Sequence, residues 1–269
     1  MPKAERAGIQ ISFDDSGSGP PVVLTHSFLC SGEMWREQVP RLAENNRVIN
    51  VDLRGHGLSS ASATPFGLYD LVDDVVAVLD SLDIERAVWA GLSVGGMLSL
   101  RAALAVPERV AGLVLIDAHA GAEKLSRRFK YRVMAVMTRR FGLSPVMPAI
   151  TRMMFGSTTR RRNPDLVNEW EEKFGAADVP SMLEYAGGLL HRDSILGRLG
   201  EISAPTLVMV GDEDTSLPPR YSEEIAAGIP GARLVLVPGA GHLSALEQPE
   251  FVTDEMQRFL GSLQRGEYP

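Results

Sequence analysis

The chain has 269 residues, of which 45% are hydrophobic and 23% are charged, and its formal net charge is −7. This composition is ordinary for a folded globular protein. The acidic balance argues against nucleic acid as the main partner, since neutralising phosphates requires clustered Lys and Arg. The single cysteine, Cys30, excludes an internal disulfide. Because Met1–Arg6 also lacks the apolar stretch of a secretory signal, we expect a cytoplasmic protein.

The first predicted element is an antiparallel hairpin at the edge of a sheet. Ile9–Phe13 alternates apolar and polar residues, and turn-forming residues fill Asp15–Pro20. Near-continuous apolar runs follow, and these are typical of strands buried on both faces of a parallel sheet. The runs are Pro21–Thr25, Arg47–Val51, Ala87–Ala90, Val110–Ile116, Thr206–Val210 and Arg233–Val237.

Helical patterns separate these runs, for example Leu68–Leu82 and a final helix over Pro249–Leu263. The sequence therefore predicts an α/β fold, with a mostly parallel central sheet and helices on both faces. Ala87–Val106 is apolar and about long enough to span a bilayer. The glycines in its middle instead indicate a tight turn between a buried strand and a buried helix, so we expect no membrane partner.

Between Asp117 and Ala204 the strand pattern stops and helical patterns dominate. We expect residues 118–202 to form a helical cap inserted into a core made of residues 1–117 and 203–269. This segment holds 14 Lys and Arg against 9 Asp and Glu, so it is basic within an acidic chain. The expected cap helices are Leu125–Phe141, Pro145–Phe155, Pro164–Gly175 and Ser181–Leu190.

A candidate nucleophile, Ser93, lies in the motif Gly91-Leu-Ser-Val-Gly95, between a predicted strand and a predicted helix. A serine in such a sharp turn has strained backbone angles, so the residues two positions away must be small. The turn lifts the hydroxyl above the sheet, next to a helix N-terminus that favours developing negative charge.

Serine is a weak nucleophile at neutral pH and needs a base and an orienting acid. We expect His242 to be the base, because it lies in a glycine-rich loop after the last strand. Asp214 follows the preceding strand and is the expected acid, with Asp117 as the alternative. We expect structural roles for His26 and His56.

Other kinds of site find little support in the sequence. Cys30 has no nearby His or basic residue to lower its pKa, so we expect it to be inert. The sequence lacks metal-ligand spacing and a nucleotide-binding glycine loop, so we expect neither a metal nor a cofactor.

The chain resembles the α/β-hydrolase superfamily across nearly its whole length. Five landmarks carry the resemblance, in the family's order: His26–Leu29, Asp52–Ser59, Gly91–Gly96, Gly211–Pro218 and Gly239–His242. In that family the loop after the third strand usually reads His-Gly, and here Ser27 replaces the glycine. The resemblance implies that the backbone N–H groups of Phe28 and Val94 form the oxyanion hole.

The general look of the sequence is similar to small carboxylesterases and enol-lactonases. It implies hydrolysis of a small-molecule ester or lactone through an acyl-enzyme at Ser93. The alternatives are an enol-lactonase acting on a carboxylate-bearing lactone, and a C–C hydrolase or perhydrolase with the same triad. A ligand receptor with slow turnover is the non-enzymatic alternative. The sequence does not define the oligomeric state.

The expected cap should cover the site and determine which substrate fits. Its candidate substrate-binding residues are Met137, Met154 and Trp170. Two readings remain for basic residues such as Arg127 and Arg128. They form a solvated face that complements the acidic core, or they attract a carboxylate-bearing substrate.

Overall fold

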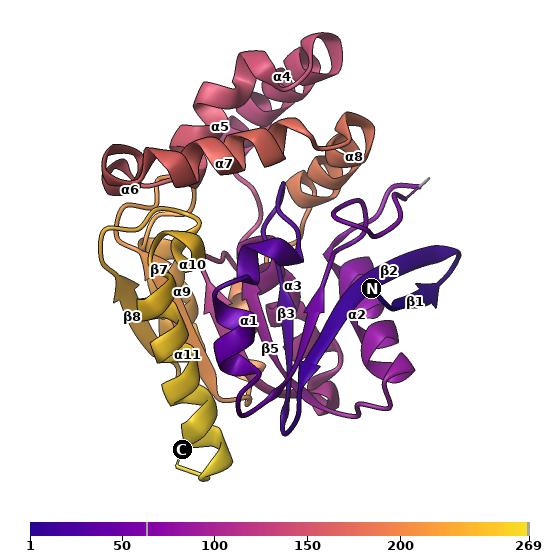
Figure 1. Cartoon of the computed structure of the whole chain (residues 1–269), viewed down its shortest axis with the longest axis vertical. Coiled ribbons are helices and arrows are strands. Elements are labelled where there is room, and N and C mark those ends of the chain that lie inside the picture. Colours follow the sequence, from indigo (N-terminus) through magenta and orange to yellow (C-terminus); the bar gives the residue numbers. More distant parts are fainter. Residues whose placement is uncertain (63, 268–269) are drawn as a thin grey trace.

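The computed structural model describes residues 1–62 and 64–267 and contains one eight-stranded sheet with the order β1-β2-β4-β3-β5-β6-β7-β8 (Figure 1). From β4 to β8 all neighbouring strands are parallel. Their carboxyl ends therefore lie at one edge of the sheet, where the loops that follow them meet. These strands are β3 (Pro21–Thr25), β4 (Arg47–Val51), β5 (Ala87–Leu92), β6 (Val110–Ile116), β7 (Thr206–Gly211) and β8 (Arg233–Val237).

The N-terminal edge differs from the hairpin predicted through Asp15–Pro20. Strand β2 (Ile9–Gly17) runs on into that segment and pairs antiparallel with β4, while its other edge pairs with β1 (Lys3–Arg6). The hairpin turn is instead at Ala7–Gly8, where both residues have positive φ. The turn residues near Gly17 only let the chain leave β2, because β4 separates β2 from β3.

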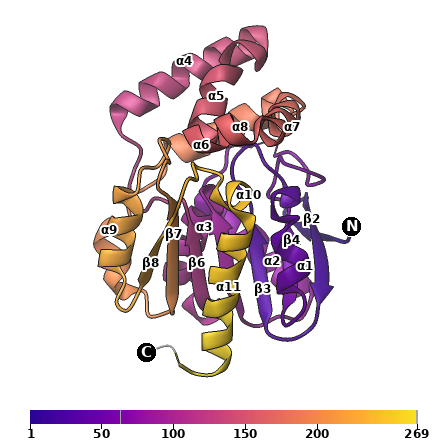
Figure 2. The ribbon, with the colours of Figure 1, turned by 60° about the vertical axis from the view of Figure 1, so that its left-hand side comes forward.

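Helices cover both faces of the sheet (Figure 2). Helix α2 (Leu68–Ser81), α3 (Val94–Ala105) and α9 (Arg220–Gly228) pack into one hydrophobic core on the first face. On the other face α1 (Gln38–Leu42), α10 (Ser244–Glu247) and α11 (Pro249–Gln264) contribute to a second core. This confirms the predicted α/β class. None of the helices that the structure describes is long and apolar enough to cross a membrane.

Between β6 and β7 the chain forms five α-helices. They lie over the carboxyl edge of the sheet (Figure 1). The expected helix Leu125–Phe141 matches α4, and Pro164–Gly175 matches α7. Helix α6, which the sequence pattern did not indicate, is short and contains the run Arg160–Arg162. The five are α4 (Leu125–Phe141), α5 (Met147–Met154), α6 (Ser157–Arg162), α7 (Pro164–Gly175) and α8 (Val179–Leu190).

The backbones of this helical segment and the His242 loop meet at a seam formed by Gly156 and Gly241. A Cβ built on Gly241 would lie 2.1 Å from the Gly156 nitrogen, so only glycine fits there. The half-buried Glu247 carboxylate accepts the N–H groups of Gly156 at 2.8 Å and Gly241 at 2.9 Å. Glu213 adds a second link by accepting the Thr158 N–H at 2.7 Å. The seam fixes one end of the segment against the loops after β7 and β8.

Candidate active site

Ser93 lies in a sharp turn between β5 and α3. Its φ of 57° and ψ of −110° are unusual for a residue with a side chain, and such strain is retained where the surroundings enforce it. A Cβ on Gly91 would lie 2.2 Å from the Gly95 carbonyl carbon, and one on Gly95 would lie 2.3 Å from the Thr25 oxygen. The two glycines of the motif therefore let strand and helix approach closely enough to present the Ser93 side chain.

A chain of two hydrogen bonds leads from Ser93 into the protein. Nε2 of His242 is 2.9 Å from Oγ of Ser93, and Nδ1 is 2.7 Å from Oδ2 of Asp214. The other Asp214 oxygen accepts the N–H groups of Ser216 at 2.7 Å and Leu217 at 2.9 Å. The carboxylate is therefore fixed on both sides, and the imidazole is oriented with Nε2 toward the hydroxyl.

The surroundings of His242 favour its protonated form. Burial lowers its pKa, but the carboxylates of Asp214, Asp117 and Glu247 raise it by more, so the pKa lies above the ordinary value for histidine. A proton taken from Ser93 would thus be held on an imidazolium stabilised by adjacent negative charge. This is the electrostatic requirement for a general base in acyl transfer.

Asp117, the alternative acid, is fully buried but does not contact His242 directly. It accepts the Gly211 N–H at 2.8 Å and the Ser244 hydroxyl at 2.6 Å. Burial and the nearby Asp214 carboxylate raise the pKa of Asp117. Its hydrogen bonds connect the ends of β6 and β7 to the start of α10.

Two backbone donors next to Ser93 are available to a ligand. In the described part of the chain, the N–H groups of Phe28 and Val94 donate no hydrogen bond. Phe28 lines the cavity described below, and Val94 is the first residue of α3. Unsatisfied N–H groups beside a nucleophile can stabilise an oxyanion.

The two histidines expected to be structural support the loop that carries Phe28. Nε2 of His26 accepts the Leu53 N–H at 2.9 Å, and Nε2 of His56 accepts the Leu29 N–H at 3.3 Å. Both contacts require an unprotonated Nε2. Burial lowers the pKa of His26 to about 4 and that of His56 to about 3, so both rings are neutral at pH 7.

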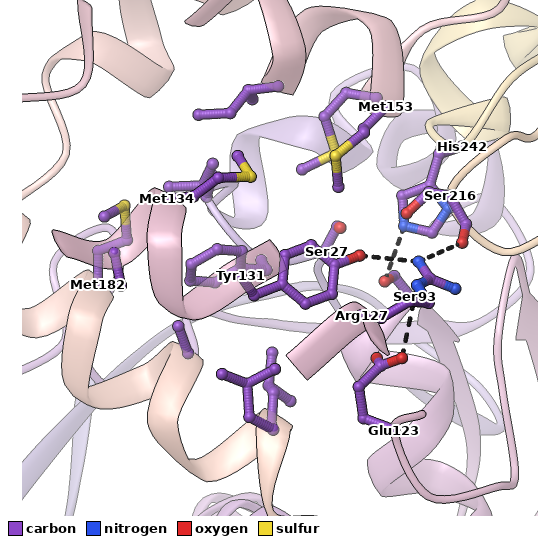
Figure 3. A pocket seen from close by; sticks show the side chains of 18 of the residues that line it. Ser27, Ser93, Glu123, Arg127, Tyr131, Met134, Met153, Met182, Ser216 and His242 are labelled. Atoms are coloured by element: carbon purple, nitrogen blue, oxygen red, sulfur yellow. Dashed lines mark hydrogen bonds and ion pairs between the residues drawn. The ribbon is translucent and has the colours of Figure 1, made fainter. Parts of the chain in front are cut away.

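A mostly apolar cavity of about 170 Å³ opens beside Ser93 and His242 (Figure 3). Its walls come from α4, α5 and α8 of the helical segment and from the loop after β3. Flexible methionine side chains give such a wall the capacity to adapt to differently shaped ligands. Those that line it are Met97, Met134, Met153, Met154 and Met182.

One end of the cavity is charged. The Arg127 guanidinium donates to the Ser216 carbonyl at 2.6 Å and the Tyr131 hydroxyl at 2.7 Å, and lies 3.4 Å from Glu123. Arg192 contacts the same Glu123 carboxylate at 3.1 Å. Two guanidinium groups thus share one carboxylate, which leaves an excess of positive charge.

The three candidate substrate-binding residues of the expected cap lie in different surroundings in the structure. Met154 lines the cavity, whereas Met137 is partly exposed and is absent from the cavity wall. Trp170 is buried within the helical segment and borders a different cavity, between α7 and the loop after β3. Sequence inspection missed Glu123 and Arg192. The spacing of Arg127 and Tyr131, one helical turn apart, was the available signal for the polar end.

Fold and site together define an enzyme class. A family model for the alpha/beta hydrolase fold matches residues 20–249, and the chain belongs to this family. Within it, the chain falls in the branch that holds esterases and enol-lactonases, since it is 31% identical to a solved esterase and 27% identical to a solved enol-lactonase over 97% of its length. It is therefore an enzyme of hydrolytic type. Among the described residues, no group of three or more His, Cys, Asp or Glu is arranged to hold a metal ion.

Three relatives show the range of proteins to which the chain is similar. The chain is similar to a Thermogutta terrifontis esterase solved with malate bound, with a TM-score of 0.92, 31% identity and coverage of 97% and 98% of the two chains. It is similar to the enol-lactonase of Burkholderia xenovorans, with a TM-score of 0.90, 27% identity and coverage of 97% and 100%. A putative non-heme bromoperoxidase, BpoC of Mycobacterium tuberculosis, is 29% identical, over 95% of this chain and 99% of its own.

Proposed function

We propose that the protein hydrolyses a carboxylic ester or lactone through an acyl-enzyme at Ser93. The observation that carries the proposal is the hydrogen-bonded chain from Ser93 through His242 to Asp214. His242 takes the Ser93 proton while the serine oxygen bonds to the acyl carbon. It then returns that proton to the departing alcohol oxygen. Water activated by His242 finally cleaves the acyl-enzyme, which releases the acid and restores Ser93.

Phe28 and Val94 complete the proposed mechanism. Their unsatisfied N–H groups would bind the oxyanion of both tetrahedral intermediates, and losing one such donor typically costs about 10²–10³ in turnover. The neutral His26 and His56 would keep the Phe28 loop in place. In a lactone the departing oxygen stays attached to the acyl group, so the same residues serve either substrate.

The test is a hydrolysis panel of short and long acyl esters alongside lactones, with mass spectrometry of the trapped acyl-enzyme. We expect turnover on at least one series and an adduct on the peptide that contains Ser93. Cleavage of carbon–carbon bonds only, or peroxide-dependent activity only, would replace the proposal with the corresponding alternative. Very slow turnover on all activated esters would point to a receptor.

A second, narrower candidate function is the hydrolysis of a lactone or ester that carries a carboxylate. It is favoured by the position of Arg127, which lines the cavity and lies in the charged end with excess positive charge. The T. terrifontis esterase, whose structure contains malate, is a relative that binds a dicarboxylate. Arg128 is the next residue along α4 but does not line the cavity, so the two arginines suggested by the sequence have different surroundings.

Arg127→Gln should therefore lower kcat/KM selectively for substrates that carry a carboxylate. A lost charge-assisted hydrogen bond is worth about 1.5–3 kcal/mol, which corresponds to roughly 10–100-fold in kcat/KM. Neutral esters of the same length should change little, and Arg128→Gln is the matched control. Equal effects of Arg127→Gln on neutral and anionic substrates would leave Arg127 as a structural contact to the Ser216 loop.

Met154→Ala should move the preferred acyl length upward by a few carbons. The substitution enlarges the cavity, and each methylene group of the substrate is worth about 1–3 kcal/mol of discrimination between substrates. Met137→Ala is the control, because Met137 lies outside the wall. Rates measured on a series of acyl lengths decide the question. A shift with Met137→Ala but not with Met154→Ala would mean that substrates occupy a different space.

A further inference from the structure

The side of helix α4 that faces away from the protein is apolar. Leu125, Phe129 and Val136 are 79%, 72% and 65% exposed, and they recur at spacings of four and seven residues. That spacing places them on one face of the helix. Val133, Met137 and Phe141 are also exposed, so a stripe of apolar side chains follows the length of the helix.

The opposite side of α4 faces the cavity. Tyr131, Met134 and Thr138 line it together with Arg127 (Figure 3). The helix is thus apolar on both sides, and only the inner side has a partner among the described residues. Figure 1 shows α4 as the outermost element of the molecule, farthest from the sheet. A contiguous exposed apolar patch of this kind marks an interaction surface.

The charge of α4 indicates what this surface contacts. The 17 residues from Leu125 to Phe141 contain six Lys and Arg and no Asp or Glu. Lys130, Arg132, Arg139 and Arg140 are exposed, around the apolar stripe. A helix with an apolar face bordered by basic residues is typical of one that lies in the headgroup region of a membrane.

We propose that the outer face of α4 docks on an anionic lipid surface, with Phe129 and Val136 inserted between headgroups and Arg132 and Arg139 contacting phosphates. A second copy of this chain fits less well, because pairing two such helices would bring like charges together. Surface binding requires no spanning helix. The proposal departs from the expectation of no membrane partner, which considered only a spanning segment.

Docking through α4 has a consequence for access to the cavity. Since the inner face of the same helix lines it, the cavity comes within about one helix diameter, roughly 10 Å, of the lipid surface. Esters that partition into lipid would be concentrated there.

The experiment is flotation with vesicles of phosphatidylcholine alone, or mixed in equal amounts with phosphatidylglycerol. We expect the full chain to float only with the mixed vesicles and to lose binding at high salt. Each basic residue near an anionic surface is worth about a fivefold change in partitioning, so Arg132→Gln with Arg139→Gln should lower it by about 25-fold. Phe129→Ser with Val136→Ser should lower it by about tenfold or more.

Leu236→Ser is the matched control, because Leu236 is exposed on β8, away from α4. All variants should keep wild-type activity on a short water-soluble ester, which also checks their folding. Three results would overturn the proposal: no flotation with mixed vesicles, equal flotation of the α4 variants and wild type, or a dimer in solution that the Phe129 and Val136 changes dissociate. The last result would assign the stripe to a second copy.

Discussion

Ser93→Ala is expected to lower turnover by roughly 10⁴–10⁶ while the protein stays folded. The loss is large because no other oxygen lies in hydrogen-bond contact with Nε2 of His242 in the described chain. Folding should survive, since among the described residues the Oγ of Ser93 forms a hydrogen bond with that ring alone, and alanine is no larger. Residual hydrolysis should come from the backbone donors and binding alone.

The measurement is kcat on the best substrate of the panel, with thermal unfolding as the check on folding. Ser99→Ala is a matched control on α3, the helix that follows Ser93, because the Ser99 hydroxyl donates to the Gly95 carbonyl at 2.8 Å and has no hydrogen bond to His242 among the described residues. It should keep most of its activity. A folded Ser93→Ala protein with near-normal turnover would remove Ser93 from the mechanism.

Asp214→Asn should cost about 10⁴ in turnover. One Asp214 oxygen accepts two backbone N–H groups, so the asparagine oxygen must stay there and its NH₂ must face Nδ1 of His242. The asparagine NH₂ and the Nδ1–H of His242 would then be two donors that face each other. The imidazole would move its proton to Nε2, where it can no longer accept one from Ser93.

Asp117→Asn should cost less than about tenfold, because Asp117 contacts Gly211 and Ser244 and not the imidazole. The reverse ranking of the two variants would transfer the role of acid to Asp117.

The pH dependence separates the two carboxylates further. Protonated His242 cannot act as a base, so kcat/KM should fall as the pH drops through its pKa. Burial lowers that pKa, but nearby carboxylates, Asp214 first among them, raise it by more. The acid limb of the pH profile should therefore lie above the ordinary pKa of histidine. Asp214→Asn should move the limb to lower pH, and Asp117→Asn should move it less. An unchanged limb in Asp214→Asn would mean that another group controls it.

The parts of the fold that repeat a regular pattern were predictable. Near-continuous apolar runs predicted the parallel strands, because a strand buried on both faces has few positions for polar residues. The N-terminal edge was not predictable in the same way. Strand β2 continues through Asp14 and Asp15 because this part of it extends beyond β1 and has a partner strand, β4, on one side only, so acidic side chains can reach solvent there. Its pairing with β4 is a long-range choice that no local turn signal encodes.

In the site, residues that belong to short local motifs could be predicted, whereas residues placed by tertiary packing could not. Ser93, Asp214 and His242 each belong to a short local pattern after a strand, and the structure brings all three together. The cavity wall depends on how α4 and α8 pack, which helical periodicity does not determine. Met137 and Met134 are equally apolar, yet only Met134 faces inward. Arg192 is about 70 residues from Glu123 in sequence and meets it only through tertiary packing.

The seam at Gly156 and Gly241 bears on protein engineering. Exchanging whole caps between relatives is an obvious route to new specificities, but a graft that replaces Gly156 would push a side chain into the backbone that carries His242. It would also separate Glu247 from one of its donors. A graft confined to residues 123–146 would leave this junction untouched and still replace the Arg127 end of the cavity. Chimaeras built on this chain therefore have a suitable exchange point within the helical segment, before α5.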